Sequence, residues 1–288
     1  MKSFKSVFIC AFVVLGSCTL FQKPTSVQIR FADDCSPQQQ VKARQVIIDR
    51  IGAVYKVGNF TDIEDGSFSV TYFPQKDVEV LPGLLEERGE IIICESYFAS
   101  EITDLLSDVI EEESMLFYFL ASVHHYPNNM DIGMAQEKDR MLIDSLFRCE
   151  EIKTRLPQDA SFVWMKKDMA SEEAYYSLMA VKKKNLMPLN QETVKSTSLD
   201  ESHFGAIIME LYPDFHQKWA AMTKRNIGRC LSIVCNEQVL SAPMVMDEIT
   251  AGKLAISGNF TTEERYIMMG LIKGGTLNCS AYVDSLDN

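Results

Sequence analysis

The histidines are the first residues to consider as metal ligands or catalytic bases, and the sequence has four of them. They are His124, His125, His203 and His216. His124 and His125 are adjacent, so on a strand their side chains would point in different directions, and no Cys, Asp or third His follows at the spacing of a zinc site. His216 lies in a helical segment without an obvious partner. The histidine pattern therefore predicts a plain loop at 124–125 and no metal site.

No segment assembles the other groups that catalysis requires. Hydrolysis needs a nucleophile, a base oriented toward it and an oxyanion pocket. The sequence offers no such constellation, and the paired carboxylates Asp247 and Glu248 are predicted to be exposed turn residues. We therefore expect a protein that is not an enzyme and that needs no cofactor.

The cysteines are predicted to serve packing. Two of the eight, Cys10 and Cys18, lie in the N-terminal segment. The others are Cys35, Cys94, Cys149, Cys230, Cys235 and Cys279. Six thiols in about 270 residues are sparse for a fold of this size, and several lie in apolar, strand-like runs where a free thiol packs as a small hydrophobe. Cys230 and Cys235 are five residues apart, so in one strand they would face opposite sides and should not pair.

The first eighteen residues have the pattern of an export signal. Lys2 and Lys5 precede an apolar run at 7–16, about half of the ~20 residues that span a bilayer, and this is typical of a secretory signal peptide. The sequence LGSC at 15–18 then resembles the lipobox of bacterial lipoproteins. That resemblance implies cleavage after residue 17 and acylation of Cys18, for example with palmitate. The alternative is an ordinary signal peptide in which Cys18 is incidental.

This reading makes residues 1–17 a signal peptide and 18–25 a tether. We expect an extracytoplasmic protein held to a bacterial membrane, inner or outer, by its lipid anchor only, since no later run is apolar for long enough to span a bilayer. The formal net charge is −12, and without Lys2 and Lys5 it becomes about −14 (−12 minus 2). This acidity argues against nucleic acid as a partner and against a polybasic face that docks on membranes.

The first third of the chain alternates between strands and helices. Ser36-Pro37 with Gln39 forms a capping box that should begin a helix. Strands are expected at 26–31, 56–66, 67–73 and 90–97, and helices from 37 and at 77–88, with turn signals at Asp65-Gly66 and Gly89. This order, β-α-β-β-α-β, is that of the ferredoxin-like unit.

The rest of the chain divides into a helical middle and a second mixed part. Residues 101–120 form an amphipathic, acidic segment in which the run at 111–113 should be solvated. Further on we expect helices at 139–153, 213–226 and 261–273, and strands at 162–165, 174–182, 206–212, 231–236, 239–245, 253–257 and 277–283. Gly228 should stop the second helix, Thr261 with Glu264 should cap the third, and Pro243 indicates an edge or a break in its strand.

Several segments resemble SecD, a membrane component of the bacterial Sec translocon. RNIGRCLSIVCNEQVLSAP (225–243) and ITAGKLAISGNFTTEE (249–264) resemble the head of its first periplasmic domain, P1. VKARQVIIDRIGAVYKVGNFTDIEDGSFSVTYFP (41–74), LLEERGEIIICES (84–96) and GLIKGGTLNCSAYVDS (270–285) resemble the base of that domain, and 136–164 resembles the connecting region of fused SecDF proteins. The likeness covers nearly all of 26–285 and is weakest at about 100–135.

The resemblance implies an α+β fold with antiparallel and mixed sheets: a ferredoxin-like βαββαβ base with an inserted α+β head subdomain. The base would comprise 26–98 and 276–288, the connecting helical region 99–160 and the head 161–275. SecD continues into transmembrane helices that carry its proton-conducting residues, whereas this sequence stops at Asn288. We therefore do not expect a proton-driven motor.

Two functions are compatible with this resemblance. The first is a non-catalytic lipoprotein that binds or handles exported or unfolded polypeptides in protein translocation, together with Sec translocon components. Binding would occur at strand edges and apolar grooves, and the candidate residues are Tyr212, Phe215, Val239, Leu240, Pro243 and Val245. The alternative is a scaffold or adaptor lipoprotein that docks on a membrane complex without binding unfolded chains.

Overall fold

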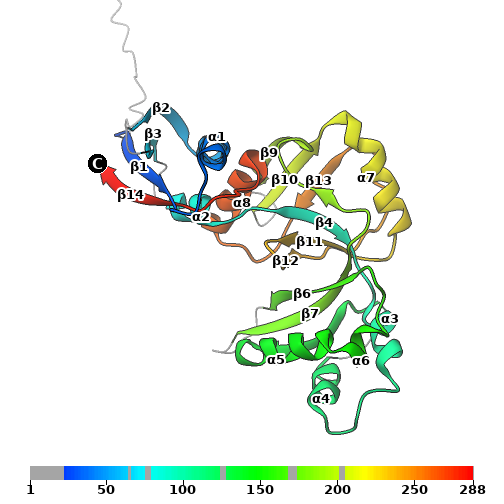
Figure 1. Ribbon diagram of the computed structural model, residues 1–288. Helices are drawn as coiled ribbons and strands as arrows, with labels where there is room; N and C mark the ends of the chain where they lie inside the picture. The colour runs from blue at the N-terminus through cyan, green and yellow to red at the C-terminus, as the bar shows by residue number, and fades with distance from the viewer. Residues whose placement is uncertain are drawn as a thin grey trace, which may run out of the picture.

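The structure is a computed structural model that describes residues 23–63, 66–74, 79–123, 128–167, 174–200 and 205–287. These residues fold into three parts, visible in Figure 1 as a blue-and-red part with both ends of the described chain, a yellow-and-orange part and a green part. We call them the base, the head and the side lobe. Among the described strands all pairings are antiparallel except one, and helices cover the sheets, so the predicted α+β class is confirmed.

The base is a four-stranded antiparallel sheet with the order β14-β1-β3-β2. Its strands are β1 (Thr25–Phe31), β2 (Lys56–Asp62), β3 (Phe68–Phe73) and β14 (Ala281–Asp287). Its helices are α1 (Pro37–Val54), the short α2 (Leu81–Glu86) and α8 (Thr262–Gly274), and α1 and α8 pack against each other. The capping boxes predicted at Ser36 with Gln39 and at Thr261 with Glu264 are confirmed.

The closing helix and strand of the base differ from those predicted. The strand expected in fourth place, β4 (Ile91–Glu95), lies in another sheet, and β14 occupies the position beside β1. Similarly, α8 packs along α1 where α2 was expected. The reason is that β4 is apolar on both faces, with Ile91 and Ile93 in the core of the head and Cys94 in a second core. A strand of that kind needs cover on two sides, which an open sheet with helices on one face does not provide.

Arg50 on α1 fixes the two places where the chain leaves the base and returns to it. Its side chain is fully buried, and its guanidinium donates to the carbonyl oxygens of Leu84 (2.8 Å), Glu87 (2.7 Å) and Arg88 (2.8 Å) around the end of α2. Its Nε donates to the carbonyl oxygen of Gly275 at 3.0 Å, just after α8. One side chain thus supplies the donors that the ends of two helices lack.

Five strands shared by the head and the side lobe form a closed ring of pairings. They are β4, β11 (Leu231–Cys235), β12 (Gln238–Ser241), β6 (Ala160–Lys167) and β7 (Tyr175–Lys182), paired in that order. A bridge between Ser96 and Val181 brings the end of β4 back to β7. Cys94, Val163 and Val239 are among the residues that fill the interior. The ring leaves few free strand edges, since β5 (Asp131–Gln136) and β8 (Met187–Pro188) extend it further.

The head adds a three-stranded sheet and one long helix. The sheet has the order β13-β10-β9, from β9 (Val194–Asp200), β10 (Ala206–Leu211) and β13 (Lys253–Ile256). Helix α7 (Pro213–Arg225) buries Trp219 and Met222 in a core shared with β4, β11 and α8. The apolar stripe of that helix is therefore core, as predicted.

The side lobe covers β5, β6 and β7 with short helices around one core. They are α3 (Ala99–Thr103), the 3-10 turn η1 (Asp104–Leu106), α4 (Met115–Ala121), α5 (Glu137–Arg148) and α6 (Glu150–Lys153). The amphipathic segment expected at 101–120 is thus broken in two. Glu113 has a φ of 63°, which no helix continues, and Ser114 begins α4 by accepting a hydrogen bond from the Phe117 amide at 3.1 Å. The acidic run at 111–113 is exposed, as predicted.

The prediction that all six cysteines serve packing is wrong for three of them. Cys35 and Cys279 form a disulfide across 244 residues. The pairing of β1 with β14 brings the segments before α1 and before β14 together, and no local pattern reports it. Of the cysteines in the described part of the chain, Cys94, Cys230 and Cys235 are free and buried, and Cys149 is free and exposed. Cys230 and Cys235 belong to different cores, in agreement with their predicted opposite faces.

Some predictions concern residues outside the described part of the chain. These are the lipid attachment at Cys18 and the loop assignment of His124 and His125. Among the described residues, the helices are all too short or too polar to cross a membrane. Within the same residues, no three His, Cys, Asp or Glu side chains come together as a metal site.

Candidate functional site

A segment at the end of β12 continues alongside β11 and leaves one of its own edges open. The Leu231 amide donates to the Pro243 carbonyl (3.1 Å), the Val245 amide to the Arg229 carbonyl (2.9 Å) and the Gly228 amide to the Val245 carbonyl (2.8 Å). We call residues 243–246 the methionine edge. The strand breaks before Pro243 as predicted, but β12 itself lies between β11 and β6 and is not an edge strand.

The turn opposite the methionine edge is built by the end of α7. The helix ends at Arg225, one residue before the predicted end at 226, and the buried Asn226 caps it because its Nδ2 donates to the Met222 carbonyl in the last helical turn at 2.8 Å. Gly228 then has a φ of 78°, a conformation that glycine adopts without strain. On the far side of the edge, the Ile249 amide donates to Thr223 Oγ1 at 2.9 Å. The edge is therefore held at both ends by α7.

Side chains and backbone groups alternate along the methionine edge. Val245 is buried in the core of the head and uses both its amide and its carbonyl toward 228–229. In an extended segment the neighbouring residues point the other way. Met244 and Met246 accordingly turn their side chains outward, 46% and 73% exposed. Because Pro243 and Val245 use their backbone groups toward 228–231, the alternation of an extended segment places those of Met244 and Met246 on the opposite side. Ile227, which is 50% exposed and bridged to Val245, extends the apolar surface.

The residues singled out from the sequence lie in different places. They are Tyr212, Phe215, Val239, Leu240, Pro243 and Val245. Tyr212 is exposed at the start of α7, with Phe215 half-buried one turn on, at the far end of a 13-residue helix about 20 Å long from the methionine edge. Val239 is buried inside the ring of strands, and Leu240 packs on the core of the head.

Of those six residues, only Pro243 combines exposure with a place on the methionine edge. Met244 lies within the apolar segment 239–245 from which candidates were drawn, whereas Ile227 and Met246 were not singled out by sequence reasoning. The signal that could have found them is the alternation in PMVM at 243–246, where a proline precedes two methionines separated by one valine.

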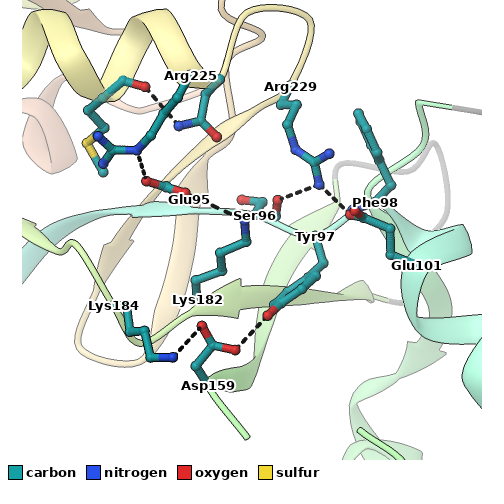
Figure 2. Close-up of polar contacts among 12 residues, drawn as sticks. Glu95, Ser96, Tyr97, Phe98, Glu101, Asp159, Lys182, Lys184, Arg225 and Arg229 are labelled. Atoms are coloured by element: carbon teal, nitrogen blue, oxygen red, sulfur yellow. Dashed lines mark hydrogen bonds and ion pairs between the residues drawn. The ribbon is translucent and has the colours of Figure 1, made fainter. Parts of the chain in front are cut away.

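Beside this edge, the chain crosses from the head to the side lobe through a compact set of polar contacts, which Figure 2 shows. We call residues 95–98 the joint. Arg229 stacks its guanidinium on the Phe98 ring at 4.0 Å, donates to the Ser96 carbonyl at 3.3 Å and pairs with the Glu101 carboxylate. Arg229, the cation next to the methionine edge, is therefore fully engaged in contacts that stabilise the joint.

The joint also contains a nearly buried carboxylate. Glu95, whose side chain is 7% exposed, lies 2.5 Å from Arg225 Nε at the end of α7 and 3.5 Å from Lys182 Nζ at the end of β7. Its neighbour Ser96 shares a buried hydrogen bond of 2.7 Å with Ser232 on β11. The head, the ring of strands and the side lobe thus meet at Glu95 and Ser96. The buried negative charge of Glu95 is compensated there by Arg225 and Lys182.

A tyrosine and an aspartate complete the joint on the side-lobe face. Tyr97 Oη donates to the Asp159 carboxylate at 2.7 Å, and Lys184 Nζ lies 3.7 Å from the same carboxylate. Burial and this hydrogen bond raise the pKa of Tyr97 to about 12, and the bond lowers the pKa of Asp159. Both groups therefore keep one protonation state at neutral pH, so the pair holds position and does not exchange protons.

The side chains of this region are suited to binding another chain. The charged side chains of the joint, Glu95, Asp159 and Arg229, are each paired, and His216 lies at the other end of α7 with its Nε2 3.1 Å from the Leu211 carbonyl. What the region leaves available is an apolar surface with outward backbone groups at the methionine edge. That combination binds extended peptide segments by adding a strand.

Comparison with known proteins identifies the relatives of this chain. Residues 168–279 match the family description of the SecDF P1 head subdomain. The protein translocase subunit SecD of Rickettsia conorii is 32% identical over 222 residues, which cover 68% of this chain and 42% of that protein. SecD of Rickettsia bellii is 29% identical over 264 residues, covering 91% of this chain and 48% of its own length. The chain thus spans about half the length of these relatives.

A solved structure is similar over most of the chain. It belongs to SecDF, described as a membrane component that enhances protein export, and covers 91% of this chain at 15% identity with a TM-score of 0.44. The SecD relatives are described as subunits of a protein translocase.

Proposed function

We propose that this chain, which is homologous to SecD subunits of the protein translocase and contains a SecDF P1 head subdomain at residues 168–279, binds exported polypeptides. The binding site that we propose is the methionine edge. The role is non-catalytic. An unfolded segment of the exported protein lies along residues 243–246 as an added strand, and its apolar side chains rest on the methionines.

The outward-facing pair Met244 and Met246 carries this proposal. Strand addition requires free backbone donors and acceptors, and these two residues turn theirs away from β11 because Val245 between them is paired inward. Methionine is flexible and polarisable, so it accommodates many apolar side chains. Only two residues of the edge offer outward backbone groups, and such a short edge favours weak, reversible binding over self-association.

We further propose that the protein works outside the cytoplasm, anchored through an acyl chain on Cys18. The lipobox-like sequence at 15–18 and the basic, apolar residues before it support this. Metabolic labelling with a clickable palmitate analogue tests it: the wild type should be labelled and the Cys18→Ala variant should not. Equal labelling of both would contradict the anchor while leaving the methionine edge unaffected.

Site-specific photo-crosslinking in living cells tests the binding proposal. A photoreactive amino acid replaces Met246, and as a matched control it replaces Tyr282, an exposed aromatic residue on β14 of the base (44% exposed). Position 246 should capture a range of unfolded exported proteins, and capture should fall when export is blocked. Capture of a single folded partner, unchanged by the block, would instead establish the adaptor function.

A backbone substitution separates strand addition from simple apolar contact. Met246→Pro removes the outward amide hydrogen and leaves the inward pairing of Val245 intact, whereas Met246→Ala removes only the side chain. We expect crosslinking from position 244 to be reduced more by Met246→Pro than by Met246→Ala. An equal effect of both would show that the backbone takes no part.

A further inference from the structure

Helix α4 carries more apolar residues than its packing requires. Its sequence is MLFYFLA, and Leu116, Phe119 and Leu120 already supply the face that is buried against the side lobe. Met115 and Tyr118, on another face, are 38% and 61% exposed. A helix on the surface of a protein normally has polar residues opposite its buried face. The apolar exposed face of α4 therefore indicates a contact surface.

This face forms one wall of a hollow between α4, β5 and α5, with a volume of about 540 Å³. Met115 and Tyr118 line it from α4, Met134 from β5 and Ile143 from α5. Leu142, beside Ile143, is 50% exposed and continues the apolar surface along α5. We call this hollow the side groove. Its size lies within the usual range of binding pockets.

The side groove has a fixed floor. Gly133 on β5 lies so close to α4 that a Cβ at this position would be 2.5 Å from the Phe119 carbonyl oxygen. The Met134 amide donates to Ser122 Oγ at 2.7 Å, which ties the end of α4 to β5, and Ser114 caps its start. The groove is therefore preformed, because α4 is held at both ends and in the middle.

The charge at the side groove is negative. The charged residues that line it are Glu113, just before α4, and Asp139, in the first turn of α5. Two cations flank Asp139 on α5. Lys138 is exposed and is not among the residues that line the groove, and Arg140 is held by Glu137 at 2.9 Å and lies over the Tyr176 ring at 4.2 Å. A partner that fits the groove must then combine apolar side chains with positive charge.

We propose that the side groove docks an α-helical segment of another protein, with an apolar face and adjacent lysine or arginine residues. A helix is the appropriate form, because the groove presents two helix flanks and side chains, whereas the outer side of β5 is already tied to Ser122. Most of the residues that line this site precede the matched head subdomain at 168–279, and Tyr175 is the exception. The site is independent of the methionine edge, which takes extended segments.

Fluorescence anisotropy with the full chain tests the proposal. The probe is a fluorescein-labelled amphipathic peptide of about 16 leucine and lysine residues at helical spacing, long enough to form a helix. The same peptide with glutamate in place of lysine is the control probe. We expect saturable binding of the leucine–lysine peptide and at least tenfold weaker binding of the leucine–glutamate peptide.

Variants assign the binding to the side groove. The double variant Glu113→Lys with Asp139→Lys should weaken binding about tenfold, because two attractive pairs become repulsive. Glu151→Lys, an exposed carboxylate of the same lobe outside the groove, should leave it unchanged. Tyr118→Ala should weaken binding in low and high salt alike. Met246→Pro should have no effect, which separates this site from the methionine edge.

Three results would overturn the proposal. One is equal binding of the leucine–lysine peptide to the wild type and to the Glu113→Lys, Asp139→Lys variant. Another is equal binding of the two peptides. The third is a dimer in sedimentation velocity that Tyr118→Asp dissociates, since the groove would then be covered by a second copy of the chain. Circular dichroism of each variant confirms that the fold is retained.

Discussion

Replacing Arg50 by methionine should destabilise the protein severely although no binding surface is touched. Methionine retains the apolar stem of the side chain and removes the guanidinium. Burial lowers the pKa of Arg50 to about 10, so the group is still a cation at neutral pH and donates all its hydrogen bonds. In the variant the carbonyl oxygens at the ends of α2 and α8 lose their donors together.

The magnitude follows from the burial of those carbonyls. The bonds to Leu84 and Gly275 are buried, and an acceptor left without a partner there costs about 1–3 kcal/mol. The bonds to Glu87 and Arg88 are partly buried, so water can replace part of the lost interaction. Relief from burying a charge offsets some of the loss. We expect the free energy of unfolding to fall by about 3–4 kcal/mol, a large share of the stability of a typical domain.

Urea denaturation followed by circular dichroism measures the loss. Hydrogen exchange locates it, since amides of α1, α2, α8 and β14 should exchange faster. The control is Arg44→Met on the same helix, where a pair of 2.7 Å with the exposed Asp62 is lost, and it should cost at most about 1 kcal/mol. A loss below about 1 kcal/mol for Arg50→Met, or faster exchange confined to α1, would refute the argument that Arg50 links the two helix ends.

Three further predictions concern the cysteines and the joint. Replacing both Cys35 and Cys279 by serine should lower the unfolding free energy by about 2–5 kcal/mol, measured in urea, and reductant should then no longer affect stability. Glu95→Gln should cost about 1–3 kcal/mol by thermal or urea denaturation, because two cationic partners lose their carboxylate but can regain water. Burial raises the pKa of Cys235 to about 12, so in the native protein at pH 8 mass spectrometry should find iodoacetamide on the exposed Cys149 and not on Cys235.

The elements were predictable wherever they depend on neighbouring residues. Four local features were predicted and are present in the structure, because each depends on residues only a few positions apart. They are the capping boxes at Ser36 and Thr261, the break before Pro243 and the apolar stripe of α7. The failures at this level are also local. The left-handed residue Glu113 ends one segment before α4 begins, and glutamate gives little warning of that conformation.

The candidate site was only half predictable. The segment at 239–245 drew attention because it is apolar and contains a proline, yet sequence could not decide which of its faces is covered. Val239 is enclosed by β6 and β11, and Val245 by the core of the head, while Met244 is left outside. Burial of this kind depends on strands that are distant in sequence, so alternation marks two faces without saying which is inner.

The sequence by itself determined where the helices with capping boxes begin, that apolar faces exist to be buried, and that reactive side chains are scattered. It did not predict the strands β5, β8 and β9. The tertiary structure alone decided that β4 leaves the base for another sheet, that Cys35 meets Cys279, and that Glu95 is enclosed by cations from two other elements. The physical reason is the range of the interactions. Caps and turns form between residues a few positions apart, whereas strand partners are selected by which large apolar surfaces can be buried together across the whole chain.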